Sequence, residues 1–143
     1  MTDSANQPKA LLHWHEVVTS RDPVMLSELL ADDATFHSPI LFQPQRGRDL
    51  TALYLVGAMH VLANDSFRYV RELSGDRDAV LEFTAEVDGI HVNGIDMITW
   101  DQNDQITDFK VMLRPFRAIQ LVQQKMAELL QAAEEDHSVD KVT

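Results

Sequence analysis

Apolar residues recur at helical spacing in the first half of the chain and again near its end. In the opening segment Leu11 and Val18 belong to one apolar stripe, which predicts an amphipathic helix. Asp22 and Pro23 then match an N-cap and a first helical position, so a second, short helix is expected to start there. The helices predicted on these grounds span residues 8–19, 23–30, 48–62 and 116–133.

The connection between the second and third helices is predicted to be mostly irregular. Residues 31–33 end the second helix and 34–37 form a short strand. Two prolines and a glycine make 38–48 an ordered loop or broken strand. The third helix follows, and its predicted apolar positions are Leu50, Leu53, Tyr54 and Met59.

From residue 66 onward the apolar period changes from 3.6 to 2, which is typical of strands with one buried face. Asp88-Gly89 is a two-residue hairpin signal between the second and third strands. Asn93-Gly94 lies inside the third strand and predicts a bulge or bend. The four predicted strands span residues 66–73, 79–87, 90–100 and 106–114.

Helices followed by an antiparallel meander indicate the α+β class, because a βαβ fold would alternate the two kinds of element. We expect N-terminal helices on the apolar face of a curved, mainly antiparallel sheet, with one more helix at the C-terminus. Alternation along the first strand puts Tyr69 and Arg71 on one face and Glu72 on the other. A chain of 143 residues fits one domain, expected over 1–133, with a polar and flexible tail at 134–143.

The charge balance narrows the possible partners. The chain has 23 acidic and 12 basic residues, a formal net charge of −11. Such a field repels polyanions, so neither nucleic acid nor an anionic membrane surface is an expected partner. No apolar run approaches the roughly 20 residues of a membrane span. Residues 1–10 lack the profile of a secretory signal, and a cytoplasmic location is therefore expected.

The sequence predicts neither a metal nor a cofactor. The chain has no cysteine, which excludes disulfides, zinc thiolate sites and a cysteine nucleophile. His13 and His15 are two positions apart on a predicted helix and point to different sides, so they cannot share a metal ion. Phosphate-binding glycine loops, zinc-protease helices and nucleophile elbows are also missing from the sequence.

Three stretches of the chain resemble the nuclear-transport-factor-2-like superfamily, in its branch of SnoaL-like polyketide cyclases and ketosteroid isomerases. They are LLADDATFHSP at 29–39, RGRDLTALY at 46–54 and GIDMITWDQNDQITDFKVML at 94–113. The resemblance implies a cone-shaped α+β barrel with a pocket between helices and sheet, and frequent homodimers through the outer sheet faces. It implies no single activity, because the fold carries isomerases, dehydratases, cyclases, hydrolases and members that only bind proteins.

Compared residue by residue, the chain keeps one of the three catalytic positions that ketosteroid isomerases have. Ser38 stands where they carry a general-base aspartate, and Trp14 stands where they carry a phenolic donor on the first helix. Asp96 occupies the place of their second oxyanion acid. The resemblance therefore does not support steroid isomerisation by that mechanism, and it singles out Asp96.

Asp96 is the first of two candidate catalytic residues. It alternates with Ile98 and Trp100, so its carboxyl is expected among apolar neighbours on one strand face. Desolvation there would raise the pKa of the carboxyl and suit it to acid–base work. The alternative is a surface carboxylate, or one paired with Arg71 or Arg114.

His37 is the second candidate, because an imidazole near a pocket mouth can take or give a proton near neutral pH. Strand alternation puts His37 opposite Phe36 and Ser38, although Pro39 can twist the strand. The alternative for His37 is a rim residue with a structural hydrogen bond. Ser38 is expected to bind a ligand oxygen and lacks the partner base that a nucleophile needs.

The remaining candidates are expected to form the wall of a mainly apolar pocket. Trp14 would offer its indole N–H to a ligand carbonyl, with plain core packing as the alternative. The predicted ligand-binding residues are Trp14, Phe36, Ser38, Tyr54, Met59, Phe83, Ile98, Phe109, Val111 and Leu113.

Three functions are compatible with these features. The leading one is an acid–base enzyme for a small hydrophobic molecule, with Asp96 and His37 as proton carriers. The second is a ligand carrier or sensor without catalysis. The third is a protein-interaction module with a filled interior, in which Val70 and Met112 on outward positions favour a homodimer. A cavity above roughly 300 Å³ would favour a ligand site over the third function.

Overall fold

The computed structural model describes residues 7–142, and for 133–142 the backbone alone. The helices are α1 (Lys9–Ser20), α2 (Pro23–Leu29), α3 (Arg48–Leu62) and α4 (Phe116–Val142). The strands are β1 (Leu30–His37), β2 (Gln45–Arg46), β3 (Arg68–Ser74), β4 (Asp78–Val87), β5 (Ile90–Trp100) and β6 (Ile106–Arg114).

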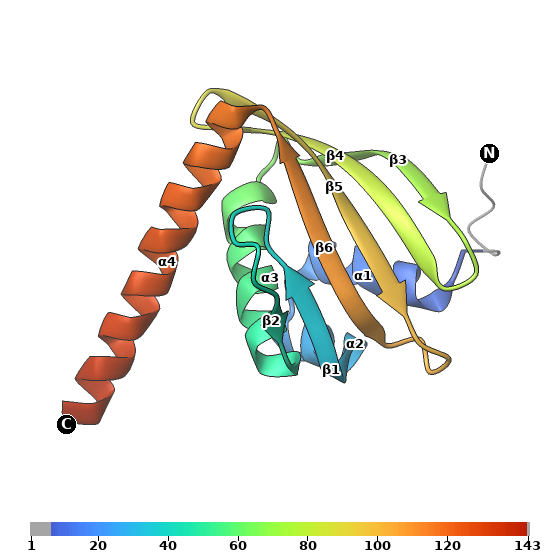
Figure 1. The fold of residues 1–143 in the computed structure, drawn as a ribbon, viewed down its shortest axis with the longest axis horizontal. Helices are drawn as coiled ribbons and strands as arrows, with labels where there is room; N and C mark the ends of the chain where they lie inside the picture. The colour runs from blue at the N-terminus through green and yellow to red at the C-terminus, as the bar shows by residue number, and fades with distance from the viewer. Residues whose placement is uncertain (1–6, 143) are drawn as a thin grey trace.

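The strands form one six-stranded sheet in the order β2-β1-β6-β5-β4-β3. The β1–β6 pair is parallel and the other pairs are antiparallel. The sheet curves, and α1, α2 and α3 lie against its inner face, while α4 starts at the end of β6 and projects from the body (Figure 1). This arrangement confirms the predicted cone-shaped α+β architecture with a mainly antiparallel sheet.

The start of α2 is confirmed and its end is corrected. The Asp22 side chain accepts hydrogen bonds from the backbone N–H groups of Val24 at 2.9 Å and Met25 at 3.4 Å, as an N-cap does. The helix ends at Leu29, and residues 30–33, predicted to complete it, belong to β1 instead. Pairing of Leu30 with Ile106 of β6 decides this, and that contact between distant segments leaves no local signal.

The predicted loop at 38–48 contains one short strand, and the inward face of α3 differs in part from the predicted one. In β2, Arg46 pairs with Thr35 of β1. Thr51 is fully buried and donates a hydrogen bond from Oγ1 to the Ala34 carbonyl at 3.1 Å. Of the four predicted apolar positions, Tyr54 and Met59 pack against the core, whereas Leu50 and Leu53 are exposed. Apolar residues surround α3, so its sequence alone did not distinguish the buried face.

A bulge or bend was predicted at Asn93-Gly94, and the bulge is absent, because the pairing of β5 with β4 and β6 runs through these residues without a shift. Gly94 instead allows the side chain of Phe83 and the backbone of β6 to lie close to β5. A Cβ at this position would lie 2.5 Å from Phe83 Cζ and 2.7 Å from the Met112 backbone oxygen, so any side chain would push β5 and β6 apart.

A register shift does occur in β3, between Tyr69 and Arg71. Tyr69 therefore lies opposite Phe83, and Glu72 lies opposite Leu81. Since Phe83 and Leu81 are both buried on the inner face, Tyr69 and Glu72 both face inward, and the alternation predicted from sequence is wrong from Arg71 onward. Arg71 turns outward, where its Nε lies 3.6 Å from Glu82 Oε1.

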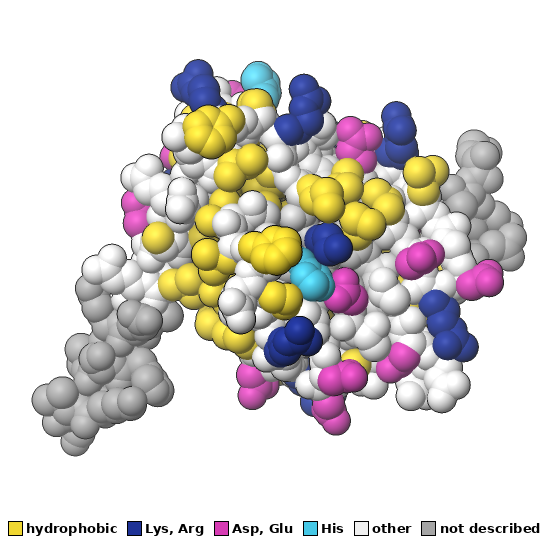
Figure 2. All heavy atoms as spheres, in the orientation of Figure 1, with side chains coloured by type: hydrophobic (Ala, Val, Ile, Leu, Met, Phe, Trp, Pro, Cys, Tyr) yellow, Lys and Arg dark blue, Asp and Glu magenta, His cyan; other side chains and the backbone are white. Residues whose placement is uncertain are grey.

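The outer face of the sheet carries hydrophobic side chains, which gather over the middle strands in Figure 2. Val70 and Met112 are about half exposed, as their outward positions predict. The homodimer expected from this face stays a prediction. No helix in the described part of the chain combines the length and apolar character that crossing a membrane requires.

The C-terminal helix is longer than predicted. α4 continues to Val142, whereas the apolar pattern predicted an end near residue 133. The flexibility expected for 134–143 stays a prediction, and residue 143 lies outside the described residues.

Candidate functional site

Asp96 lies on the inner face of β5, between Leu81 of β4 and Val111 of β6. Its exposed fraction is 6%, and it is one of the few polar residues in the core of the described chain. Neither Arg71 nor Arg114 pairs with it, since Arg71 contacts Glu82 and Arg114 donates to Asn93. The predicted apolar surroundings of this carboxyl are therefore present.

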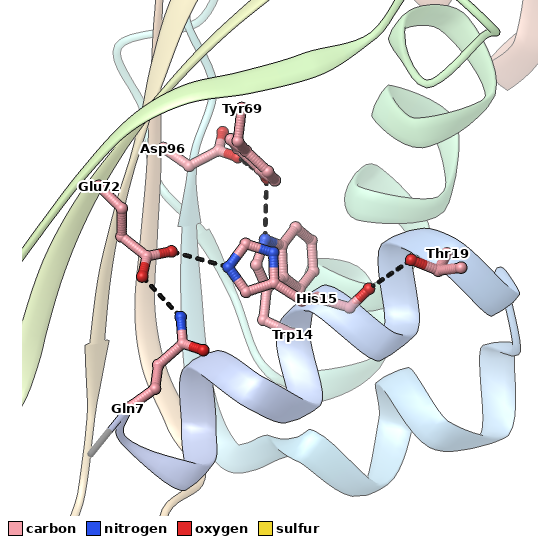
Figure 3. A network of polar contacts seen from close by, with 7 residues as sticks. All are labelled: Gln7, Trp14, His15, Thr19, Tyr69, Glu72 and Asp96. Carbon is pink, nitrogen blue, oxygen red and sulfur yellow. Dashed lines mark hydrogen bonds and ion pairs between the residues drawn. The ribbon is translucent and has the colours of Figure 1, made fainter. Parts of the chain in front are cut away.

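A chain of two hydrogen bonds ends on Asp96 (Figure 3). Trp14 Nε1–H donates to the Tyr69 hydroxyl oxygen at 2.9 Å, and the Tyr69 hydroxyl donates to Asp96 Oδ2 at 2.6 Å. The indole can only donate, so the Tyr69 oxygen is the acceptor of the first bond, and the Tyr69 hydroxyl proton makes the second. The Tyr69 proton is thus directed to Oδ2, and a proton bound by Asp96 belongs on its other oxygen, Oδ1.

Asp96 Oδ1 is open to the interior space. It makes no hydrogen bond among the described residues. In this part of the chain, every fully enclosed side-chain oxygen or nitrogen has a hydrogen-bond partner. Oδ1 must therefore border open space, and the hollow lined by Asp96 supplies it. This oxygen is the atom through which Asp96 can meet a ligand or a water molecule.

Burial changes the acidity of both groups at the end of this chain. It raises the pKa of the Asp96 carboxyl from the ordinary 3.8 to about 7, and the hydrogen bond from Tyr69 opposes part of that rise. Burial, followed by the neighbouring Asp96, raises the pKa of the Tyr69 phenol well above 10. Near neutral pH Asp96 can therefore gain or lose a proton, while Tyr69 stays a neutral donor.

The hollow beside Asp96 is small and apolar. Its volume is about 40 Å³, roughly enough for a water molecule or a single functional group. Three of its lining side chains carry a polar atom, those of Trp14, Tyr69 and Asp96. Of the predicted site residues, those that line this hollow are Trp14, Met59, Phe83, Asp96, Phe109 and Val111.

A second, larger hollow of about 230 Å³ lies between α3, β6 and the first half of α4. It is bordered by apolar side chains with few polar ones among them. Of the predicted site residues, those that line it are Phe36, Ser38, Tyr54, Val111 and Leu113. The single pocket predicted from sequence is therefore divided into two compartments.

The structure separates His37 from Asp96, so the prediction that the two share a pocket is wrong. His37 Nε2 lies 2.8 Å from Asp108 Oδ1, on the opposite face of β1 from Phe36. It lines neither hollow. The strand alternation that opposed His37 to Phe36 holds through the end of β1, because Pro39 lies beyond the strand.

Three further expectations change with the structure. The Trp14 N–H donates to Tyr69 and is not free for a ligand carbonyl. Ser38 Oγ accepts hydrogen bonds from the backbone N–H groups of Ile40 and Leu41, and so shapes its own loop. Ile98 is fully buried and lines neither of the two hollows.

Tyr69 is the site residue that sequence reasoning missed. Its signal was a phenol that shares one face of a predicted strand with Phe67 and Leu73. Behind Tyr69 lies a second polar layer, which the β3 register shift turns inward (Figure 3). His15 Nε2 lies 2.7 Å from Glu72 Oε1, and the His15 ring meets the Tyr69 ring edge-on at 5.4 Å. The phenol is thereby held in place from α1.

A Tyr69→Phe variant is expected to raise the pKa of Asp96 further, because the hydrogen bond that lowers it is lost. A hydrogen bond to a charged group contributes about 1.5–3 kcal/mol, which corresponds to a titration midpoint roughly one to two pH units higher. Carboxyl ¹³C resonances followed over pH measure this midpoint. Tyr54→Phe, which changes the tyrosine of the larger hollow, is the control and should leave it in place. A midpoint that stays or falls in Tyr69→Phe would contradict the assigned role.

The chain matches the family model described as SnoaL-like domain over residues 11–109. A solved steroid delta-isomerase from Pseudomonas aeruginosa shares 35% identity, with 88% of this chain and 92% of that chain covered at a TM-score of 0.83. An uncharacterised protein with a cystatin-like fold from Silicibacter pomeroyi shares 27% identity over 94% of both chains, also at 0.83. A candidate SnoaL-like polyketide cyclase from Shewanella denitrificans shares the fold, at 15% identity and a TM-score of 0.59. That alignment covers 87% of this chain and 96% of the cyclase. No curated protein matches the chain.

Proposed function

This chain belongs to the SnoaL-like domain family, and we propose that it moves protons to and from a small, neutral, mainly apolar molecule, with Asp96 as the proton carrier. The observation that carries this proposal is the open Oδ1 of a buried carboxyl whose pKa is about 7. A general acid or base works best when its pKa lies near the working pH. The similarity to a steroid delta-isomerase, at 35% identity, supports a reaction of the proton-transfer type.

The chemistry of the hollow favours a neutral ligand with one hydrogen-bonding group. An anionic group would meet the Asp96 carboxylate and a net charge of −11, and apolar walls would leave other charged groups unpaired. A carbonyl oxygen can accept from protonated Oδ1, and a C–H bond next to a carbonyl can lose its proton to ionised Oδ1. Neutral ketones are therefore the proposed ligand class.

Ser38 makes the mechanism different from that of a ketosteroid isomerase. It stands at the position of the general base in those enzymes. Its Oγ accepts hydrogen bonds from the backbone N–H groups of Ile40 and Leu41. Asp96 is the only carboxyl among the described residues that line either hollow. The proposed reaction therefore uses one group, which takes a proton from the ligand and returns one.

Hydrogen–deuterium exchange tests this proposal without a known product. In D₂O, Oδ1 takes a proton from a carbon next to the ketone carbonyl, exchanges it with solvent and returns a deuteron. We expect the protein to accelerate this exchange for some members of a panel of cyclic and linear ketones, measured by ¹H NMR. Asp96→Asn should lower the rate by about 10²–10⁴-fold, the usual contribution of a positioned acid or base. Acting as a base, Asp96 should give a rate that rises with pH and levels off above about 7.

Asp108→Asn is the matched control, since it changes a carboxyl on the outer face of the sheet, next to His37. Its exchange rate should equal that of the wild type. Equal rates in wild type and Asp96→Asn would refute the proton-carrier role.

The presence of a single carboxyl favours, as a second candidate, a protein that binds such molecules without turnover. Tight ketone binding with no exchange in any variant would establish that candidate instead.

A further inference from the structure

Tyr69 lies on β3, which ends the strand order of the described sheet and pairs with β4 alone. The register of that pairing shifts just after Tyr69, so the ladder is interrupted next to the phenol. The sheet therefore supports this residue from one side only. Its hydroxyl nevertheless makes a hydrogen bond of 2.6 Å to Asp96, and the remaining support comes from α1.

Two cross-links run next to each other from α1 to β3 (Figure 3). Trp14 Nε1–H donates to the Tyr69 hydroxyl oxygen at 2.9 Å. The next residue of the helix, His15, places Nε2 2.7 Å from Glu72 Oε1. Gln7, just before α1, donates to the other Glu72 oxygen at 2.6 Å. We refer to these five residues as the α1–β3 seam.

The register shift in β3 decides which charge belongs to the seam. Strict alternation would turn Arg71 inward with Tyr69 and would turn Glu72 outward, and the shift reverses this. A guanidinium near Asp96 would favour the carboxylate and lower its pKa. With Glu72 in its place, burial first, Asp96 next and Glu72 in addition raise the pKa of the Tyr69 phenol. The phenol therefore stays a donor.

The other elements around Asp96 present apolar side chains to it. Its paired neighbours on β4 and β6 are Leu81 and Val111. The residues of α3 that line the hollow beside it are apolar as well. Among the described residues, the ionisable groups on this side of Asp96 are therefore Tyr69 and, behind it, the pair of Glu72 and His15.

We propose that Glu72 and His15 are positioning residues, whose bond across the α1–β3 seam keeps the Tyr69 hydroxyl directed at the proton carrier. Neither residue lines a hollow, so both act through the phenol. The inference rests on the proposed function in naming Asp96 as the proton carrier. When the bond is broken, β3 and α1 are held together less firmly and the phenol spends part of its time away from Asp96, which then ionises less readily.

The titration of Asp96 tests this inference. Glu72→Leu and His15→Phe each remove the bond, and phenylalanine keeps an aromatic ring beside Tyr69. Both side chains are partly exposed, so the variants should fold, as circular dichroism can verify. In each, the ¹³C titration midpoint of Asp96 should rise by about half to one pH unit, a part of the rise expected when the Tyr69 hydrogen bond is lost altogether. The pH at which ketone exchange levels off should rise equally.

Glu72→Gln separates the bond from the charge. Glutamine can accept from Gln7 through its oxygen and donate to a neutral His15 ring through its nitrogen, so it should restore the wild-type midpoint. His13→Ala removes an exposed histidine of the same helix and is the matched control, also with the wild-type midpoint. A midpoint that moves as far in Glu72→Gln as in Glu72→Leu would assign the effect to charge and overturn the inference.

A double variant separates positioning from a general loosening of the domain. If Glu72 acts through the phenol, Tyr69→Phe combined with Glu72→Leu should titrate as Tyr69→Phe does alone. A further rise in the double variant would contradict the inference. Unchanged midpoints in both Glu72→Leu and His15→Phe would contradict it as well.

The titration requires no ligand, so the two proposals can fail separately. If the seam variants raise the midpoint and the wild type exchanges no ketone, the proposed function fails and the positioning of the phenol stands. If the wild type exchanges ketones and the seam variants keep its midpoint, only the positioning role of Glu72 and His15 fails.

Discussion

An Asp96→Asn variant is expected to gain stability relative to the wild type as pH rises. Burial raises the pKa of Asp96 from 3.8 to about 7, so between these values the folded protein holds a proton that the unfolded chain has released. Stability of the wild type therefore falls with rising pH over this range and levels off above it. Three pH units correspond to about 4 kcal/mol, and asparagine, which cannot ionise, avoids this cost.

Urea unfolding of both proteins at several pH values measures the effect. Between pH 5 and pH 8.5 the difference in unfolding free energy should move by about 3 kcal/mol in favour of the variant, since part of the change lies below pH 5. Asparagine can still accept the Tyr69 hydroxyl bond through its amide oxygen, so the fold should be preserved. Asp33→Asn, which removes an exposed carboxylate of β1, serves as the control. A constant difference across pH would show that the Asp96 carboxyl ionises as freely in the folded protein as in the unfolded chain.

Gly94→Ala is expected to be strongly destabilising although it adds one methyl group. The new Cβ would lie 2.5 Å from Phe83 Cζ, 2.7 Å from Leu113 Cδ2 and 2.7 Å from the Met112 backbone oxygen. Side chains can rotate away, but the backbone oxygen belongs to β6 and moves only with the strand. Overpacking of a core costs about 1–3 kcal/mol, and the backbone contact puts this case at about 3. The melting temperature should fall by roughly 10 °C.

The same substitution at Gly57 provides the comparison. A Cβ there would approach only the end of the Met126 side chain, which is flexible and can move. Gly57 also lies inside α3, where alanine is favoured over glycine by up to about 1 kcal/mol. Gly57→Ala should therefore melt at or above the wild-type temperature. Equal melting temperatures for Gly94→Ala and wild type would mean that β5 and β6 can separate at little cost.

The candidate site was only partly accessible from the sequence. Asp96 could be chosen because strand alternation is a local rule and its neighbours Ile98 and Trp100 are large and apolar. Tyr69 could not be ranked, since its importance depends on meeting Trp14 and Asp96 from two other elements. His37 was misplaced because its chemistry suggested a pocket, whereas the structure places it on the outer face next to Asp108.

The sequence by itself determined the α+β class, the N-cap of α2, the hairpin at Asp88-Gly89 and most strand limits, because periodicity and turn residues act within a few positions of the chain. Tertiary structure alone decided that residues 30–33 are a strand, that α3 buries Thr51 and that Glu72 turns inward after the β3 register shift. It also decided that one predicted pocket is two hollows divided at Ala58, Leu62 and Val111. Pairing between distant strands and the fit of side chains from different elements have no period along the chain. They become defined only when those elements meet.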